Sequence, residues 1–361
     1  MISRTPKPLK IGMYSPYLSI LGGGERYFLS IAEILSQKEN VTIFFDKSIS
    51  PKVKDTLGIN LDKVSFESEK KISSSSAISK FKLLLKMDAF FYMTDGSVFL
   101  PGAKRNFLII QSPGHMPGIT ISQTIKTAGW KVLCYSQFMK SILENRLKKP
   151  ATILSPGIDT LVYHTTTKTK QPIILTVGRF FSYPHDKKQK ILIETFKEHS
   201  LTLFKGWRLI VAGGLTEKSG EKVLEDLQEC ASGYPIDFKV NVSFLELIKI
   251  YKKSTIYWHA AGYGEDLYSH PERAEHFGIT TLEAMAAGCV PVVYDGGGQR
   301  DIVENGVNGY LWREPLDLVK HTMHILDHEE TYLSLVGNAF KKAEEYSQPN
   351  FYEKVVKLLH R

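Results

Sequence analysis

Short apolar runs alternate with segments of helical spacing along the whole chain. The first alternation is a strand over residues 9–14, a helix over 25–36 and a strand over 41–45. Strands and helices that alternate in this way build parallel sheets, because each helix carries the chain back to the starting edge of the sheet. Four more strands are predicted in the first half, at 89–93, 107–111, 131–135 and 151–154. The pattern predicts an α/β fold.

A second series of strands begins after a polar stretch that ends in a proline. Its members are 173–177, 207–212, 236–242, 255–259 and 290–294. We therefore predict two doubly wound Rossmann-like domains that face a central cleft. Their predicted bounds are 1–165 and 173–345, with a linker at 166–172. Residues 346–361 have helical apolar spacing and are expected to dock on one domain, with a crossing back to the first domain as one option.

Composition indicates a soluble globular protein. Of 361 residues, 43% are hydrophobic and 23% are charged, and no apolar run approaches the roughly 18 residues of a spanning helix. The N-terminus has no apolar segment typical of a secretory signal. Cys134, Cys230 and Cys289 are too scattered for a metal knuckle or a disulfide framework. A reduced, cytoplasmic protein is expected.

Positive charge is concentrated in the first half of the chain. The net charge is +8, and residues 1–165 hold 22 Lys and Arg against 12 Asp and Glu. This excess favours an anionic partner: a phospholipid surface, a phosphorylated acceptor or a nucleic acid. Residues 78–86 combine helical apolar spacing with three lysines. This segment is either a helix that lies on an anionic membrane or an ordinary amphipathic helix on the core.

The stretch 275–288 carries the strongest chemical signal. Glu275 and Glu283 lie eight positions apart around a turn that opens a helix. Gly278 lets a ligand approach the backbone, and the free amides of a helix start attract phosphate. Glu283 would accept hydrogen bonds from ribose hydroxyls, and Glu275 would face the sugar. The stretch predicts a nucleotide-sugar site.

Two cations follow the first strand of the second half. Arg179 comes directly after this strand, and Lys187 precedes the next helical segment. A planar guanidinium and a mobile ammonium suit the two negative charges of a nucleoside diphosphate. The alternative is that both are solvated surface residues.

Two glycine turns offer bare backbone next to helix starts. Gly23 and Gly24 precede the first helix, and Gly297 and Gly298 follow the strand at 290–294. Their amides would receive phosphate or sugar, or the glycines simply make tight turns. The first turn lacks the G-x-G-x-x-G spacing of a dinucleotide fold. The histidines around residues 259–276 match no standard metal site, so this segment is expected to shape the donor pocket.

Several motifs together resemble one enzyme family. They are Gly22-Gly23-Gly24-Glu25, Tyr135-Ser136-Gln137-Phe138, Ser155-Pro156-Gly157-Ile158-Asp159, Val177-Gly178-Arg179 with Lys187, the pair Glu275 and Glu283, Gly296-Gly297-Gly298, and Asn308-Gly309-Tyr310-Leu311-Trp312. With these motifs the chain resembles the retaining glycosyltransferases of family 4, which have the GT-B fold. The resemblance covers nearly the whole chain.

The resemblance implies a nucleotide-sugar donor in the second half and an acceptor in the first. Arg179 and Lys187 would bind the diphosphate, Glu283 the ribose, and Glu275 the sugar near its reacting carbon. The residues Phe277, Gly278, Ile279 and Thr280 would line the donor site. The resemblance implies no metal and no cofactor, with a UDP- or GDP-linked sugar as co-substrate, and the chain contains no Asp-x-Asp.

One position departs from the family pattern. Many relatives place a histidine after the strand at 107–110, where this chain has Gln111, and His115 follows four residues later. Glutamine cannot act as a base. We assign His115 as a catalytic candidate, and the acceptor-side role stays open between Gln111 and His115.

The sequence thus predicts a retaining hexosyltransferase of cell-surface polysaccharide or glycolipid synthesis. The acceptor would be a hydroxyl of a glycan or lipid-linked molecule at the inner face of the membrane, and no nucleic acid partner is expected. Two alternatives remain: a disaccharide phosphorylase or sucrose-type synthase on the same fold, and a non-catalytic nucleotide-sugar binding protein.

Overall fold

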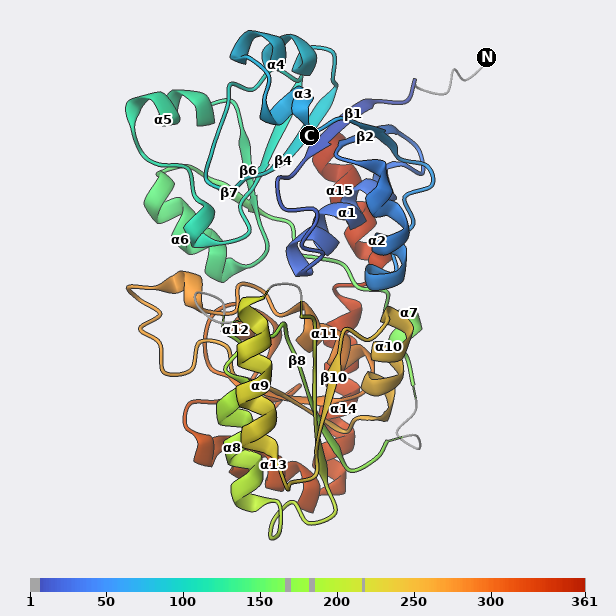
Figure 1. Ribbon diagram of the computed structural model, residues 1–361, viewed down its shortest axis with the longest axis vertical. Helices are drawn as coiled ribbons and strands as arrows, with labels where there is room; N and C mark the ends of the chain where they lie inside the picture. The colour runs from blue at the N-terminus through green and yellow to red at the C-terminus, as the bar shows by residue number, and fades with distance from the viewer. Residues whose placement is uncertain (1–6, 166–169, 182–185, 216–217, 361) are drawn as a thin grey trace. The chain divides into compact units, whose positions relative to one another are not determined.

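The chain forms two compact units, each built around its own parallel sheet. A computed structural model describes residues 7–165, 170–181, 186–215 and 218–360 (Figure 1). Unit 1 comprises Met1–Gly157 together with Phe351–Arg361, and unit 2 comprises Ile158–Asn350. Unit 1 is therefore assembled from two segments that are far apart in the sequence.

The sheet of unit 1 has seven parallel strands in the order β3-β2-β1-β4-β5-β6-β7. The strands are β1 Lys10–Tyr14, β2 Asn40–Phe44, β3 Ser65–Glu67, β4 Ala89–Met93, β5 Arg105–Ile109, β6 Lys131–Cys134 and β7 Ala151–Ile153. Ile11 on β1 pairs with Val41 on one side and with Ala89 on the other. The strand order reverses between β1 and β4, and this reversal marks the position where such sheets bind ligands.

Apolar residues fill these strands because a parallel sheet is covered on both faces. All five residues of β4 are buried. The core beside it is aromatic: the rings of Phe99 and Trp130 contact each other, and each also contacts the rings of Phe90 and Tyr92. The indole N–H of Trp130 donates to the carbonyl of Phe99 at 2.9 Å, so the buried polar atom of this ring is satisfied.

Seven helices belong wholly or largely to unit 1 within the described residues. They are α1 Gly23–Leu35, α2 Ser50–Leu57, α3 Lys70–Ser73, α4 Ala77–Leu84, α5 Ile121–Thr127, α6 Gln137–Leu147 and α15 Gln348–His360. Glu25 caps the start of α1, because its carboxylate accepts from the Gly22 amide at 2.8 Å. A 3-10 turn, η1 Lys47–Ile49, precedes α2, and a second, η2 Pro113–His115, follows β5.

Helix α15 completes the core of unit 1. Phe351 is 2% exposed, and a Cβ atom on Gly157 would lie 2.5 Å from the Phe351 Cβ. The ring of Phe351 also contacts that of Tyr27 on α1, with the centroids 5.9 Å apart. The C-terminal helix is therefore part of unit 1.

The sheet of unit 2 has six parallel strands in the order β10-β9-β8-β11-β12-β13. The strands are β8 Ile173–Val177, β9 Arg208–Gly213, β10 Ile236–Val240, β11 Ile256–His259, β12 Val290–Tyr294 and β13 Tyr310–Trp312. The order reverses between β8 and β11, which pair directly. The core includes Trp258 on β11 and Trp312 on β13.

The helices of unit 2 pack in two groups. They are α7 Thr160–Tyr163, α8 Gln189–His199, α9 Ser219–Ala231, α10 Phe244–Lys253, α11 Ile279–Ala286, α12 Gln299–Ile302, α13 Pro315–Asp327 and α14 Glu329–Glu344, with a 3-10 turn η4 at Pro271–Arg273. Helix α8 lies beside α9 and contacts α13, whereas α11 packs against α7 and α14 (Figure 1). No helix among the described residues is long and apolar enough to cross a membrane.

The predicted fold class is confirmed: both units are doubly wound parallel α/β domains. The three-residue strands β3 and β13 were not predicted. Residues 166–169 of the predicted linker lie outside the described residues. Lys170, also in that linker, belongs to unit 2, where its ammonium donates to the carbonyls of Ser254 and Ala287 at 2.5 and 2.6 Å. It thereby caps the C-terminal ends of α10 and α11.

Replacing Phe351 by alanine is expected to destabilise unit 1. Removing a buried phenylalanine ring typically costs about 3–5 kcal/mol of unfolding free energy. Urea unfolding followed by circular dichroism will measure the change. Lys357→Ala, at an exposed position of the same helix, is the control and should change stability by less than about 0.5 kcal/mol. Equal stability of the two variants would show that α15 does not complete the core.

Candidate functional site

The reversal of strand order in unit 2 brings three charged or polar side chains together. Lys187 follows β8, His259 is the last residue of β11, and Glu275 ends the long loop that follows β11. The carboxyl ends of neighbouring parallel strands meet at one edge, so the two strands deliver Lys187 and His259 to the same place.

One carboxylate oxygen of Glu275 accepts hydrogen bonds from both Lys187 and His259. The Glu275 Oε2 atom lies 2.7 Å from Lys187 Nζ and 3.1 Å from His259 Nε2. The Glu275 side chain is 16% exposed, that of Lys187 is 25% exposed and that of His259 is 3% exposed. The carboxylate is therefore mostly shielded from water but still reachable.

The surroundings keep Glu275 ionised. Burial alone would raise the pKa of Glu275, but the charge of Lys187 and the hydrogen bond from His259 outweigh it and hold the pKa well below its ordinary value. Burial lowers the pKa of His259 more than Glu275 raises it. At neutral pH the cluster consists of an ammonium, a carboxylate and a neutral imidazole.

These protonation states fix the tautomer of His259. An ionised carboxylate can only accept, so the Nε2 atom of His259 must carry the proton. Its Nδ1 atom is then a bare acceptor, and it is buried without a hydrogen-bond partner among the described residues. His259 therefore donates to Glu275 and orients its carboxylate.

A second ion-pair cluster holds the loop that carries Glu275. Glu265 accepts from Lys188 at 2.6 Å and from Arg273 at 2.7 Å, one partner on each carboxylate oxygen. Lys188 has a left-handed backbone with φ of 54°, which turns its side chain away from that of its neighbour Lys187. Two adjacent lysines are thus paired with Glu275 and Glu265, and the loop is fixed at both points.

The glycine turn after β12 packs directly on the Glu275 segment. The amide of Gly298 donates to the Glu275 carbonyl at 2.7 Å, and a Cβ atom on Gly297 would lie 2.2 Å from that same oxygen. The Gly298 amide, predicted to face a ligand, is used here inside the protein. The turn therefore sets the position of Glu275.

Gly278 directly precedes helix α11 and has a left-handed backbone, with φ of 106°. A Cβ atom there would lie 2.9 Å from the side chain of Gln299, so both conformation and space require glycine. Ile279 and Thr280 form the first turn, and Phe277 is buried before it.

Glu283 lies deeper in the unit than the sequence indicates. It is 1% exposed, and its two carboxylate oxygens accept from the hydroxyls of Tyr163 and Tyr251 at 2.7 and 3.0 Å. In this arrangement the tyrosines occupy the oxygens that were predicted to bind ribose.

Arg179 follows β8, as predicted. Its guanidinium lies over the ring of Phe181, 5.5 Å from the centroid. The structure therefore brings Lys187 together with Glu275, while Arg179 takes a separate position on the same edge of the sheet.

The reversal in unit 1 gathers a second set of polar residues. Tyr17 follows β1, Asp95 follows β4, and His115 ends the turn η2. The rings of Tyr17 and His115 stack with centroids 5.2 Å apart. Burial lowers the pKa of His115, and the charge of Asp95 opposes this shift. The Nδ1 atom of His115 is buried without a hydrogen-bond partner among the described residues.

Gln111 contacts the glycine turn of α1 instead. A Cβ atom on Gly24 would lie 1.9 Å from the Gln111 Oε1 atom, so only glycine admits this side chain. Gly23 opens the same helix. The turn therefore accommodates Gln111, and His115 lies with Tyr17 at the position of strand reversal.

The second half of the chain matches a known protein family. The family model described as glycosyl transferases group 1 matches residues 161–342, which is half of the chain. The chain belongs to the group 1 glycosyl transferases. The matched part includes Lys187, His259, Glu275 and Glu283.

A curated relative shares part of this region. The GDP-Man:Man(3)GlcNAc(2)-PP-Dol alpha-1,2-mannosyltransferase of Dictyostelium discoideum is 23% identical over 200 residues, which cover 53% of this chain and 37% of that enzyme. The match therefore spans well under half of the length of the Dictyostelium enzyme.

Two solved structures share the fold over nearly the whole chain. The glycosyltransferase from Rickettsia africae superposes with a TM-score of 0.75 at 16% identity and covers 98% of each chain. The Anabaena protein HepE in complex with UDP-glucose superposes with a TM-score of 0.71 at 15% identity and covers 98% of this chain and 99% of its own. The group 1 transferase described here thus has the GT-B fold.

The sequence analysis placed His259 at the edge of a segment expected to shape the donor pocket, but gave it no role of its own. It did not single out Tyr163 or Tyr251. Both tyrosines resemble ordinary core residues in sequence, and Tyr163 lies 120 positions from its partner Glu283.

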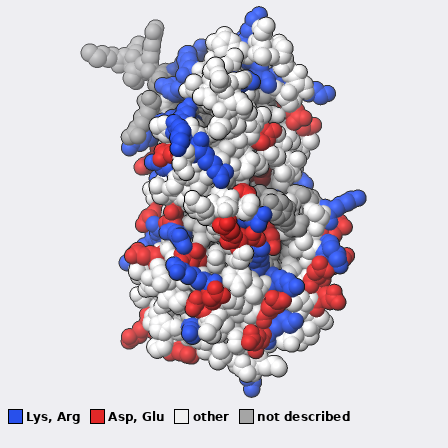
Figure 2. Space-filling model, turned by 90° about the vertical axis from the view of Figure 1, so that its left-hand side faces the viewer, with Lys and Arg blue, Asp and Glu red and all other residues white. Residues whose placement is uncertain are grey.

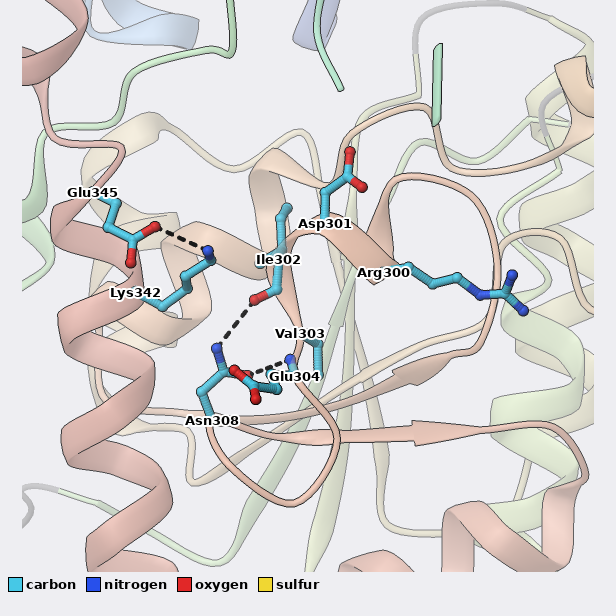
Figure 3. A pocket seen from close by; sticks show the side chains of 8 residues that line it. All are labelled: Arg300, Asp301, Ile302, Val303, Glu304, Asn308, Lys342 and Glu345. Carbon is cyan, nitrogen blue, oxygen red and sulfur yellow. Dashed lines mark hydrogen bonds and ion pairs between the residues drawn. The ribbon is translucent and has the colours of Figure 1, made fainter. Parts of the chain in front are cut away.

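A separate polar pocket of about 410 Å³ lies on unit 2, beside α12 and α14 (Figure 3). Its lining residues are Arg300, Asp301, Ile302, Val303, Glu304, Asn308, Lys342 and Glu345. Lys342 pairs with Glu345 at 2.9 Å, and Arg300 extends toward Asp295, with which it pairs at 2.6 Å. No residue of the predicted site lines this pocket.

Removing either tyrosine hydroxyl is expected to destabilise unit 2. Tyr163→Phe and Tyr251→Phe each leave an oxygen of the buried Glu283 without that donor, at a cost of about 1.5–3 kcal/mol of unfolding free energy. Urea unfolding will measure it, with Tyr268→Phe at a 96% exposed position as the control. Unchanged stability in both variants would contradict a structural role for these hydrogen bonds.

The His259 imidazole is expected to make the protein sensitive to acid. Its pKa is lowered on folding, so below its ordinary value of 6.5 the unfolded chain binds this proton more readily and stability falls as the pH drops. His259→Gln keeps a donor for Glu275 but cannot take up a proton. The variant should lose less stability than the natural chain between pH 7 and 5, as measured by thermal unfolding. Parallel pH curves for the two proteins would be the contrary result.

Proposed function

We propose that this group 1 transferase is a retaining, metal-independent hexosyltransferase. It moves the sugar of a nucleotide-diphosphate sugar to a hydroxyl of a glycan or lipid-linked acceptor. The observation that carries the proposal is the cluster of Lys187, Glu275 and His259 at the position of strand reversal in unit 2. A cation beside an ionised carboxylate suits a donor that is anionic at its diphosphate and rich in hydroxyls at its sugar.

Lys187 has the chemistry to stabilise the departing diphosphate. The Lys187 side chain is 25% exposed and its ammonium is held by one carboxylate oxygen, so it can exchange this partner for phosphate oxygens. Arg179 lies on the same edge and adds a fork of donors. The amides at the start of α11 add partial positive charge. Together these groups oppose the charge that develops on the leaving phosphate.

Glu275 would bind the donor sugar near its reacting carbon. The lowered pKa of Glu275 keeps it ionised, and a carboxylate there accepts hydrogen bonds from sugar hydroxyls and stabilises the positive charge of an oxocarbenium-like transition state. In a front-face reaction the bond from the anomeric carbon to phosphate breaks while the bond to the acceptor oxygen forms on the same side. The leaving phosphate takes the acceptor proton, so no protein base is required for that step.

Comparisons with known proteins support the donor class. The Dictyostelium relative is named for GDP-mannose, and HepE was solved with UDP-glucose. A donor linked to GDP or UDP is therefore the first to test. A thermal-shift screen of UDP- and GDP-sugars separates them, because a donor present at about 100 times its Kd stabilises the protein by about 2.7 kcal/mol.

The acceptor is proposed to bind at Tyr17, Asp95 and His115 of unit 1. An aromatic ring, a carboxylate and an imidazole with a bare buried nitrogen offer stacking and hydrogen bonds for a hydroxyl-rich acceptor. We propose that the enzyme acts at the inner face of the membrane when its acceptor is lipid-linked. No nucleic acid partner is proposed.

Substitution of Lys187 tests the phosphate-binding role. Lys187→Ala should lower kcat/KM for transfer by at least about 100-fold, because it removes a charge that acts on the leaving group. Lys190→Ala on the exposed side of α8 is the matched control and should leave kcat/KM unchanged. Activity of the purified variants is measured with the donor found by the thermal-shift screen. Near-normal turnover by Lys187→Ala would refute the proposed role.

A further inference from the structure

Helices α4 and α5 of unit 1 place apolar side chains in solvent. Helix α4 buries only Leu84, and α5 buries no residue at all. Around them six large apolar side chains are between 38% and 82% exposed: Ile78, Phe81, Leu85, Leu100, Ile121 and Ile125. Helices that serve only the core would turn these residues inward.

The six side chains lie on neighbouring segments of unit 1. A Cβ atom on Gly102 would lie 2.8 Å from the Leu84 Cβ, so the loop around Leu100 lies against α4. A Cβ atom on Gly129, just after α5, would lie 2.6 Å from Pro101 in that same loop. The loop therefore connects the two helices. We call these six residues together with Lys80, Lys82 and Lys86 the apolar-lysine face.

Carboxylates are missing from the segments that build this face. Residues 70–87 hold five lysines and no Asp or Glu, and residues 96–143 hold five Lys and Arg and again no Asp or Glu. On the side drawn in Figure 2, unit 1 shows blue side chains bordering white surface with few red ones, whereas unit 2 mixes both colours. The segments that carry the exposed apolar groups thus bear positive charges only.

This combination fits an anionic bilayer. Helical positions 78, 81 and 85 share one face of α4 with Lys82, and 121 and 125 share one face of α5. Such a face inserts aliphatic groups into the headgroup boundary while its lysines attract anionic lipids. Single-stranded nucleic acid is recognised by stacking on aromatic rings, and this face is mainly aliphatic.

We propose that the apolar-lysine face docks unit 1 on the surface of an anionic lipid bilayer. The inference deepens the membrane part of the proposed function, because it names the surface and the lipid class that would hold the acceptor-binding unit. It does not rest on the donor chemistry of unit 2.

The test is sedimentation of the full chain with vesicles. One set contains phosphatidylcholine alone, and the other contains phosphatidylcholine with phosphatidylglycerol. We expect binding to the anionic set, weakened but not abolished by salt, because the aliphatic part is not screened. Lys80→Gln, Lys82→Gln and Lys86→Gln together should weaken binding by about 100-fold, at about fivefold for each lysine.

A variant that replaces two isoleucines by serine tests the apolar part of the face. Ile121→Ser with Ile125→Ser should weaken binding about tenfold or more and leave the melting temperature unchanged, because neither side chain is buried. The matched controls lie in unit 2: Leu201→Ser with Leu203→Ser, and Lys205→Gln with Lys239→Gln, all at exposed positions. The controls should bind vesicles like the natural chain.

Three results would overturn the inference. The first is equal binding of the natural chain to both vesicle sets. The second is vesicle binding that neither face variant weakens, and the third is a loss of binding in the unit 2 controls as large as in the face variants. Transfer to a water-soluble acceptor is measured in parallel. Normal transfer with lost vesicle binding supports the face as a membrane contact, whereas lost transfer with normal vesicle binding assigns the face to the acceptor or to a protein partner. If neither the natural chain nor any variant transfers sugar, the proposed function is wrong. The vesicle result is still valid in that case, because it does not depend on transfer.

Discussion

The shared carboxylate of Glu275 is the interaction on which the site in unit 2 depends. The carboxylate joins Lys187, which follows β8, to His259 at the end of β11, and the backbone carbonyl of the same residue accepts from Gly298 after β12. A carboxylate so poorly solvated is costly unless it is paired and hydrogen-bonded. Lys187 and His259 meet that requirement, and the amide of Gly298 fixes the backbone behind it.

This arrangement also explains the second ion-pair cluster. The loop between β11 and Glu275 is long, so its end would be poorly defined if Glu275 were its only anchor. Glu265, paired with Lys188 and Arg273, provides a second anchor ten residues earlier. The left-handed backbone of Lys188 lets neighbouring lysines serve both anchors, and the glycines at 278 and 297 supply the turns that other residues would strain.

Much of the fold was predictable because parallel strands are buried on both faces and stand out as apolar runs. The strands β1, β4, β8 and β12 were placed to within a residue. Glu275 and Lys187 were also predicted as partners in one site, from motif spacing and the resemblance. Their direct ion pair and the contribution of His259 were not, since a hydrogen bond between side chains 16 positions apart leaves no local pattern.

The depth of Glu283 was unpredictable for a similar reason. Its position in the motif indicates a ligand, but its burial depends on Tyr163, which precedes β8, and on Tyr251 at the end of α10. The same long-range packing places Thr160–Tyr163 in unit 2, so the observed division falls after Gly157 and not after residue 165. Local sequence shows the elements, while the contacts between distant elements decide where each unit ends.

The two-segment construction of unit 1 has a consequence for the order in which the protein is made. Unit 2 is contiguous and has every residue it needs once Asn350 has been added, whereas unit 1 waits for Phe351 and the rest of α15. During synthesis the first 157 residues therefore leave the ribosome before Phe351 can pack against Gly157 and Tyr27. Nascent chains of this kind expose apolar surface for longer than a contiguous domain does. The half of the protein that is translated first is thus the last to reach its native core.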